Sequence, residues 1–212
     1  MNHYKKPSLA EEKSLRLQGY QYIAGVDEVG RGALMGPVVA AAVILPDNFK
    51  ACWKSQVRDS KQLTPQIREY LYPYIQETSV AWSVSESSNE VIDTVGIAKA
   101  TRLAMVQAIE KLEPKAQYLL IDYVKLTESV LPQKSIKFGD SLVFSIACAS
   151  ILAKVHRDRL VTAIDKDYPG YGFAAHKGYG TEWHLKCLRE KGPCPLHRRS
   201  FSPVGELVGL QR

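Results

Sequence analysis

Acidic residues at the ends of apolar segments are the first candidates for chemistry in this sequence. Asp27 and Glu28 follow the run YIAGV, Asp122 ends the run QYLLID, and Asp140 precedes a long segment with a helical pattern. A charge in such a position is costly to bury unless something compensates it. Mg²⁺ and similar cations take oxygen ligands, and three or four clustered carboxylates are the form of a two-metal phosphodiester site. The pattern therefore predicts a metal-dependent site.

Each acid taken alone has a simpler interpretation. An aspartate before a helix is most often a cap, so Asp140 is also a candidate cap for the helix expected to begin near Ser145. An aspartate that ends a strand is most often a turn residue. Only the recurrence of acids at the edges of apolar elements favours the metal site.

The segment after the first two acids contains two glycines around an arginine, Gly30, Arg31 and Gly32. Adjacent residues of a strand point to opposite faces, so Asp27 and Glu28 reach one site only where the strand ends or bends. Glycines permit such a sharp exit, and they let the backbone approach a substrate without an intervening Cβ atom.

A second group of potential ligands lies near the C-terminus, in the order His184, Cys187, Cys194 and His197. This order resembles a zinc site. The inner spacing is short for a structural zinc site, and prolines bracket Cys194, so the pattern argues against zinc. The sequence contains no P-loop and no Ser-His-Asp pattern.

Alternation and helical periodicity predict the elements that carry these residues. The expected strands are residues 20–27, 36–46, 79–87 and 117–122, and the expected helices are an N-terminal one capped by Ser8, one capped by Thr64, and the segments 88–112 and 145–165. The first two strands are joined by too few residues for a crossover, so they should be antiparallel. A later strand–helix–strand order implies a mixed sheet flanked by helices, an α/β fold.

The chain has 212 residues, 45% of them hydrophobic and 24% charged, which suits a globular protein. We expect one domain over residues 1–212, with 166–212 as a basic C-terminal segment packed on it. The net charge of +6 suits a polyanionic partner. The N-terminus lacks the apolar part of a signal peptide, and no run is long enough to span a membrane. With only four cysteines, the expected location is the cytoplasm.

Six motifs together resemble the ribonuclease HII family: GVDEVGRG with GPVVAAAVIL, DSKQLT, LLIDY, GDSLVFSIACASILAKVHRDR, YPGYGFAAHKGYGTEWH and HRRSF. The resemblance runs from residue 25 to 201. It implies a ribonuclease H-like fold with a five-stranded mixed sheet and an endonuclease that depends on Mn²⁺ or Mg²⁺. The implied substrates are RNA–DNA hybrids and single ribonucleotides in duplex DNA, and the implied cut lies on the 5′ side of the ribonucleotide. The biological role implied is ribonucleotide excision repair. We expect the protein to be a monomer.

The resemblance also assigns roles by motif. The catalytic and metal-binding acids of the family fall on Asp27, Glu28, Asp122 and Asp140. The residues implied to bind the substrate are Gly30, Arg31, Gly32, Lys61, Ser145 and Tyr179. On this basis, the backbone of the Gly-Arg-Gly segment is expected to read the 2′-hydroxyl group that distinguishes RNA from DNA, and Tyr179 is expected to pack on the following deoxyribose.

Four positions depart from the usual family pattern: Tyr123 stands where glycine is common, Ala33 and Met35 alter the GRGPLAGP motif, and Phe138 is inserted before Gly139. None removes an acid, but Tyr123 raises a question about the loop beside Asp122. Two alternatives stay open. Another ribonuclease H-like DNA nuclease or resolvase would share the acids, and a non-enzymatic nucleic-acid-binding protein would leave them unexplained.

Overall fold

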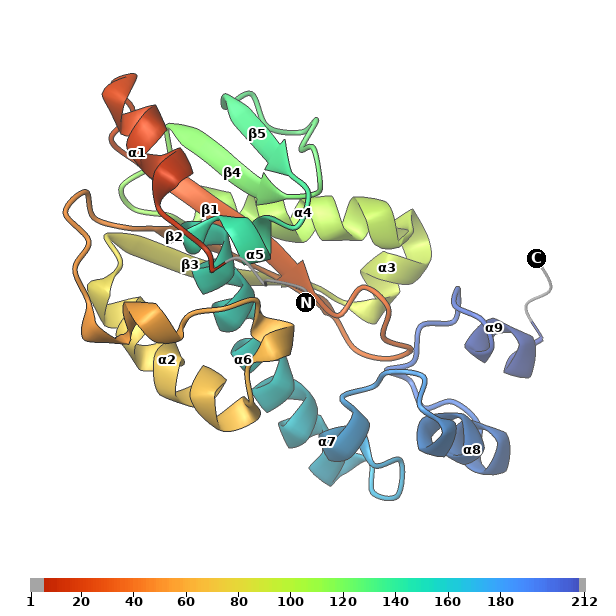
Figure 1. Ribbon diagram of the computed structural model, residues 1–212. Coiled ribbons are helices and arrows are strands. Elements are labelled where there is room, and N and C mark those ends of the chain that lie inside the picture. The colour runs from red at the N-terminus through yellow and green to blue at the C-terminus, as the bar shows by residue number, and fades with distance from the viewer. Residues whose placement is uncertain (1–5, 210–212) are drawn as a thin grey trace.

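The computed structural model describes residues 6–209 as an α/β fold built on one mixed sheet (Figure 1). The strands are β1 (Ile23–Val29), β2 (Val38–Ile44), β3 (Ala81–Ser87), β4 (Tyr118–Asp122) and β5 (Gln133–Ile136). Their spatial order is β3-β2-β1-β4-β5. The β1–β2 and β2–β3 pairs are antiparallel, whereas β1–β4 and β4–β5 are parallel. The predicted mixed five-stranded sheet and its antiparallel first pair are confirmed.

The helices flank this sheet and extend beyond it. They are α1 (Ala10–Leu17), α2 (Pro65–Thr78), α3 (Asn89–Val95), α4 (Ile97–Glu110), α5 (Gly139–Leu142), α6 (Phe144–Asp167), α7 (Phe173–His176), α8 (Glu182–Lys191) and α9 (Val204–Leu207), with short 3₁₀ turns η1 (Cys52–Gln56) and η2 (Ser60–Gln62). Thr64 caps α2 as predicted, because its Oγ1 accepts the N–H of Ile67 at 3.3 Å.

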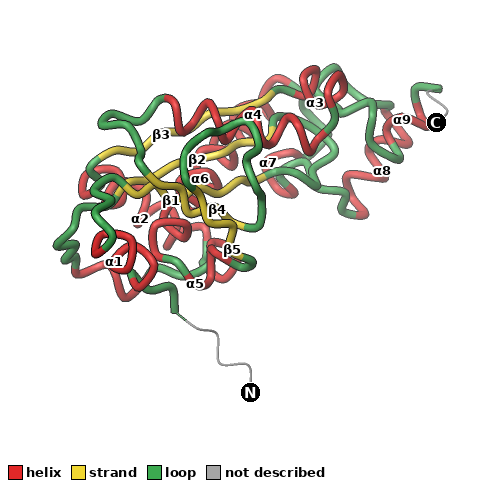
Figure 2. Tube along the Cα trace, turned by 90° about the horizontal axis from the view of Figure 1, so that it is seen from above, coloured by secondary structure: helices red, strands yellow, loops and turns green. Residues whose placement is uncertain are grey.

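The apolar run of β2 is buried on both of its faces, as expected for a central strand covered by helices on each side. Val39, Ala41 and Val43 belong to the core that includes α2 and α6. The alternate residues Ala40 and Ala42 belong to the core that includes α4. Helix α6 therefore covers one face of the sheet and α4 covers the other (Figure 2).

Three local predictions need correction. The segment 88–112 is two helices, because Gly96 has φ +79° and interrupts it. The predicted loop between Asp122 and Asp140 contains the short strand β5. Helix α1 has Leu9 rather than Ser8 as its N-cap residue, and the Ser8 hydroxyl accepts the N–H of Ala10, the first helical residue, at 3.4 Å.

The C-terminal part forms the helices α7, α8 and α9, and Figure 2 shows the last two at one end of the molecule, beyond the sheet. Backbone hydrogen bonds join this part to the segment before β2: Leu34 N–H donates to Gly178 O, and Gly36 N–H donates to Leu196 O. None of the helices within residues 6–209 combines the length and apolar character that crossing a bilayer requires.

Candidate active site at the ends of β1 and β4

Two of the predicted acids lie on neighbouring parallel strands: Asp122 ends β4, and Asp27 lies two residues before the end of β1, which continues past the predicted boundary to Val29. Val26 of β1 lies beside Ile121 of β4, so the residues that follow them, Asp27 and Asp122, lie side by side. Asp27 is only 4% exposed. Its pKa is raised well above the ordinary value, first by burial and then by the charges of neighbouring Glu28 and Asp122. The fold thus brings together acids that are 95 positions apart in the chain.

Glu28 has one carboxylate oxygen paired and one unpaired. Arg31 Nη1 lies 3.3 Å from Glu28 Oε1, whereas Oε2 is buried and has no hydrogen-bond partner. Burial raises the pKa of Glu28; the charge of Arg31 opposes this shift, and that of Asp122 adds to it. The N–H of Glu28 donates to Asp27 Oδ1 at 2.7 Å, which fixes the neighbouring carboxylate.

Asp140 reaches the same site from the first turn of α5. It is 4% exposed, and Lys61 Nζ lies 3.3 Å from its Oδ2. Burial and the neighbouring carboxyl group of Asp59 raise the pKa of Asp140. Next to it, Gly139 N–H donates to Asp122 Oδ1 at 2.6 Å, which ties α5 to the end of β4. The charge of Asp140 also raises the pKa of Asp27, as expected of groups in one site.

These acids provide the donor set for a divalent cation. Among residues 6–209, no three His, Cys, Asp or Glu side chains already form a metal-binding group, and cationic side chains contact Glu28 and Asp140. Nevertheless, Glu28 Oε2 is a buried anionic oxygen without a partner, and Asp27 is buried among like charges. Such oxygens are the ligands that Mg²⁺ and Mn²⁺ take, so the residues fit such an ion.

Backbone strain is concentrated around this region. Tyr123, Phe138 and Lys177 are the non-glycine residues with positive φ among residues 6–209, at 56°, 60° and 54°. Tyr123 follows Asp122, and Phe138 precedes Gly139. Left-handed backbone favours glycine, which accounts for the usual glycine at the position of Tyr123. The loop therefore keeps the conformation that glycine would adopt, although the residue differs.

The Gly-Arg-Gly loop and Tyr179 lie next to each other, as expected of two parts of one substrate surface. Ala33, just after the loop, forms an antiparallel bridge with Tyr179. Gly30 has φ +89°, and a Cβ on Gly32 would have no atom within 4 Å. The ring of half-buried Tyr179 lies 5.5 Å from Arg157 Cζ.

Ser145 lies elsewhere. It is fully buried at the start of α6, and its N–H donates to Glu12 Oε1 at 2.9 Å. A Cβ on Gly25 would meet its backbone carbon at 2.3 Å. Ser145 therefore joins β1 to α6 in the interior of the free protein, and its contact with a substrate stays a prediction.

The predicted zinc ligands form a packed, hydrogen-bonded group. The Nε2 atoms of His184 and His197 lie 3.0 Å apart, and His184 Nδ1 lies 3.0 Å from Tyr179 O. Cys187 Sγ donates to Gly170 O at 3.4 Å, while Cys194 Sγ lies 3.1 Å from His197 Nδ1. The Nε2 atoms of the two rings point at each other, so in this structure the four side chains are joined to one another and to backbone groups.

Several residues that support the site were not predicted. Asp59 lies in the DSK segment next to Asp140, and Ser150 on α6, whose hydroxyl lies 2.8 Å from that of Ser60, acts to lower the pKa of Asp27. The signal for Asp59 was present, since it is an acid two residues before Lys61. Buried Arg157 and Arg198 also contact the loops around the site, and no local pattern marks them.

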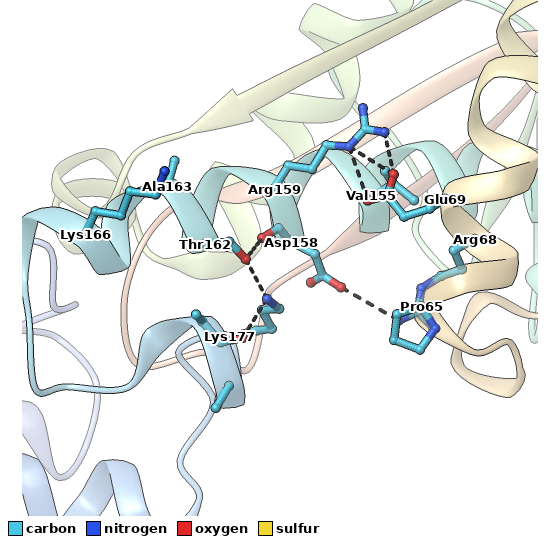
Figure 3. Close-up of a pocket in the computed structure, with 12 residues that line it drawn as sticks. Pro65, Arg68, Glu69, Val155, Asp158, Arg159, Thr162, Ala163, Lys166 and Lys177 are labelled. Carbon is cyan, nitrogen blue, oxygen red and sulfur yellow. Dashed lines mark hydrogen bonds and ion pairs between the residues drawn. The ribbon is translucent and has the colours of Figure 1, made fainter.

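A separate hollow lies between α2, α6 and α7 and has a volume of about 560 Å³ (Figure 3). Its charged side chains pair across it: Arg159 with Glu69, and Arg68 with Asp158. The four acids do not line it. Deep clefts are common binding sites, but the chemistry of this protein gathers at the strand ends, outside this hollow.

A mixed α/β sheet that brings together carboxylates from two adjacent central strands is typical of metal-dependent hydrolases of the ribonuclease H-like class. Comparison with known proteins agrees. The family model described as "Ribonuclease HII" matches residues 24–204. Ribonuclease HII of Dehalococcoides mccartyi strain BAV1 is 57% identical over 205 residues, which cover 96% of this chain and 97% of that protein.

Solved structures support the same assignment. The crystal structure of ribonuclease H2 from Pyrococcus horikoshii OT3 superposes with a TM-score of 0.74 and 25% identity, covering 88% of this chain and 96% of that one. Bst-RNase HIII in complex with Mn²⁺ shares the fold, with a TM-score of 0.65 at 20% identity; the match covers 89% of this chain and 70% of that one. The chain belongs to the ribonuclease HII family, whose members are metal-dependent endoribonucleases that act on RNA–DNA hybrids.

Proposed function

We propose that this ribonuclease HII cleaves on the 5′ side of a ribonucleotide, both in RNA–DNA hybrids and at single ribonucleotides embedded in duplex DNA. The products would carry a 3′-hydroxyl and a 5′-phosphate, and the biological role would be ribonucleotide excision repair. The observation that carries the proposal is the pair Asp27–Asp122, which lies side by side on two adjacent parallel strands, with Asp27 buried and Asp122 half-buried. Asp27 lies on β1, the strand that leads into the loop with the open backbone at Gly32.

The acids Asp27, Glu28, Asp122 and Asp140 would hold Mn²⁺ or Mg²⁺. The Mn²⁺ complex of Bst-RNase HIII supports this choice by analogy of fold. When bound, such an ion stabilises the charge that develops on a phosphodiester and lowers the pKa of the attacking water. The chain itself prepares the site by burying Asp27 and Asp140, and by placing Arg31 and Lys61 against Glu28 and Asp140.

The substrate would lie across the Gly30–Gly32 loop. Amide groups of this loop would contact the 2′-hydroxyl, which both donates and accepts hydrogen bonds. Arg31, whose side chain is 41% exposed, would contact a phosphate while remaining close to Glu28. Tyr179 would pack on the deoxyribose that follows, and exposed Lys61 would contact the backbone near Asp140.

We further propose that the chain acts as one domain and as a monomer. The backbone bonds between the 34–36 segment and the C-terminal part support a single unit. The residues assigned to metal and substrate all come from one chain, so the proposed site needs no second copy.

The test is cleavage of a duplex with one embedded ribonucleotide, compared with the same duplex made entirely of DNA, with Mg²⁺, with Mn²⁺ and with chelator. We expect a single cut on the 5′ side of the ribonucleotide that requires the ion, and no cut of the all-DNA duplex. The Asp27→Asn protein should be folded and inactive. Equal cleavage of both duplexes would favour a DNA nuclease or resolvase, and an active Asp27→Asn protein would refute the metal site.

A further inference from the structure

Arg198 is fully buried beneath the Gly-Arg-Gly loop. Its Nη2 and Nη1 atoms donate to the carbonyl oxygens of Gly30 and Arg31, each at 2.8 Å. Its Nε donates to Gly36 O at 2.9 Å. One guanidinium group therefore holds three carbonyl groups on both sides of the turn between β1 and β2. Arginine suits this role because its planar group presents several donors in a fixed geometry.

Arg157 of α6 is a second fully buried arginine in the same region. Its Nε and Nη2 atoms donate to Pro37 O at 3.1 Å and Met35 O at 3.2 Å. Its Nη1 donates to Lys177 O at 2.9 Å, two residues before Tyr179. Arg157 therefore connects the segment after the Gly-Arg-Gly loop with the turn that carries Tyr179.

The direction of these bonds fixes which backbone groups remain for a ligand. In a trans peptide unit the C=O and N–H groups point in opposite directions. The carbonyl groups of Gly30 and Arg31 point inward to Arg198, so the N–H groups of Arg31 and Gly32 point away from it. Because Gly32 is exposed, its outward N–H is open to a substrate.

The local sequence accommodates both arginines. A Cβ on Gly30 would lie 2.2 Å from Arg157 Nε, so a glycine is needed there for the guanidinium group to fit. Neither arginine forms an ion pair with a carboxylate within residues 6–209, and their partners are carbonyl groups. Burial and the charge of Arg157 lower the pKa of Arg198 to about 9, so it stays protonated at neutral pH.

We propose that Arg157 and Arg198 are positioning residues for ribonucleotide recognition. Arg198 aims the N–H groups of Arg31 and Gly32 at the substrate, and Arg157 sets the distance between that loop and Tyr179. The inference rests on the proposed function, because it assumes that the loop and Tyr179 contact the substrate. It adds two residues that never touch the substrate and act through other groups.

The first test replaces each arginine by lysine, which keeps the charge but loses the planar fork of donors. We expect Arg198→Lys and Arg157→Lys to lower kcat on the single-ribonucleotide duplex at least tenfold, with KM changed less than threefold. The matched control is Arg159→Lys, two residues along α6, where the exposed arginine pairs with Glu69 (Figure 3). It should cleave like the wild type. Circular dichroism and thermal melting would establish that each variant is folded.

The second test separates positioning from general stability. In a Tyr179→Ala background, Arg157→Lys should lose most of its effect on kcat, because the group through which it acts is gone. Arg198→Lys should keep its effect in that background, since it acts through the other loop. If Arg157→Lys lowers kcat by the same factor in the Tyr179→Ala background as in the wild type, Arg157 does not act through Tyr179 and this half of the proposal is wrong.

The third test needs no arginine variant, so it stands even if those variants do not fold. In ¹⁵N NMR spectra of the Asp27→Asn protein, the amides of Arg31 and Gly32 should exchange rapidly with water. They should shift on binding a single-ribonucleotide duplex and much less on binding the matched DNA. Protected amides in the free protein would overturn the role of Arg198. A wild-type protein that cleaves neither substrate would instead overturn the proposed function itself.

Discussion

Gly25 of β1 packs directly against the backbone of Ser145 in α6. A Cβ atom at position 25 would come within 2.3 Å of the Ser145 carbonyl carbon and 2.5 Å of Ile146 N. Gly25 lies two residues before Asp27, and Ser145 lies five residues after Asp140. The contact therefore sets the separation of the two segments that bring these acids together.

Gly25→Ala is expected to destabilise the protein strongly. The new methyl group would collide with helix backbone, which cannot turn aside as a side chain does. Overpacking at a site this tight should cost about 3 kcal/mol or more, which lowers the melting temperature by roughly 6–12 °C for a chain of this size. Gly32→Ala is the control for thermal melting, because its Cβ meets no atom within 4 Å. A Gly25→Ala protein as stable as the wild type would contradict the observed packing.

Gly32→Ala should separate activity from stability. The position is exposed and has no positive φ, so alanine fits the free protein. If the substrate backbone approaches this residue closely, the added methyl group stands in its way. We expect kcat/KM on the single-ribonucleotide duplex to fall at least tenfold while the melting temperature stays within about 2 °C, corresponding to less than ~1 kcal/mol. Unchanged cleavage would place the substrate elsewhere.

Tyr123→Gly should stabilise the protein. Tyr123 has φ 56° and is 68% exposed, so glycine relieves the left-handed backbone and loses little packing. Relief of the backbone strain should stabilise the folded state by about 1–2 kcal/mol. The greater entropy of glycine in the unfolded chain opposes this, so we expect the free energy of unfolding to rise by about 0.5–1 kcal/mol. Tyr123→Ala is the control, since it removes the ring and keeps the strain. Denaturant unfolding of both variants measures the difference, and equal stabilities would argue against strain at this position.

The sequence predicted those parts of the fold that rest on local pattern. Apolar runs marked four strands, and the pair Thr64–Pro65 marked the start of α2. The strand β5 has the sequence QKSI, which is too polar and short to stand out from a loop. Likewise, the break at Gly96 depends on a positive φ that periodicity does not reveal.

For the site, the sequence indicated which acids end strands, but not which strands are neighbours. That β4 lies beside β1, and so places Asp122 beside Asp27, follows from long-range pairing. The family resemblance supplied the acids as a set, yet it included buried Ser145 among the contacts. The buried, carbonyl-binding roles of Arg157 and Arg198 could not be predicted, because arginine is usually exposed and their carbonyl partners come together only in the folded chain.

Substitutions of Tyr179 test the junction contact. Tyr179→Phe keeps the ring beside Arg157 and should cleave nearly like the wild type. Tyr179→Ala removes the surface that would pack on the deoxyribose. We expect it to lose at least tenfold in kcat/KM on a single-ribonucleotide duplex, and less on a continuous RNA–DNA hybrid. Two variants that both match the wild type would show that Tyr179 is only a packing residue.

Protons in the group around His184 and His197 can be assigned from its hydrogen bonds. His197 Nδ1 accepts the N–H of Cys194 at 2.9 Å, so the proton of this neutral ring is on Nε2. That proton points at His184 Nε2, 3.0 Å away, which must then accept it. His184 Nδ1–H in turn donates to Tyr179 O at 3.0 Å. A second proton between the two Nε2 atoms would break this chain of bonds, so both rings should stay neutral.

This arrangement predicts that stability is lost in mild acid. Burial lowers the pKa of His184 and of His197 to about 4, with the nearby histidines adding to the shift. In the unfolded chain the pKa is about 6.5, so between these values the unfolded state binds more protons. The contribution of each ring is therefore complete above pH 6.5 and falls progressively as the pH drops towards 4. For one ring, the full loss in the free energy of unfolding is roughly 3 kcal/mol.

The measurement is urea unfolding of the wild type and His197→Gln between pH 7.5 and pH 4.5. Glutamine keeps a polar side chain but does not titrate, and both proteins share the carboxylates of the site. The carboxylate contributions therefore cancel in the comparison. The wild type should lose more stability on acidification than the variant, so the gap between them should narrow as the pH falls. A gap that stays constant would mean that these rings do not need to be neutral in the folded protein.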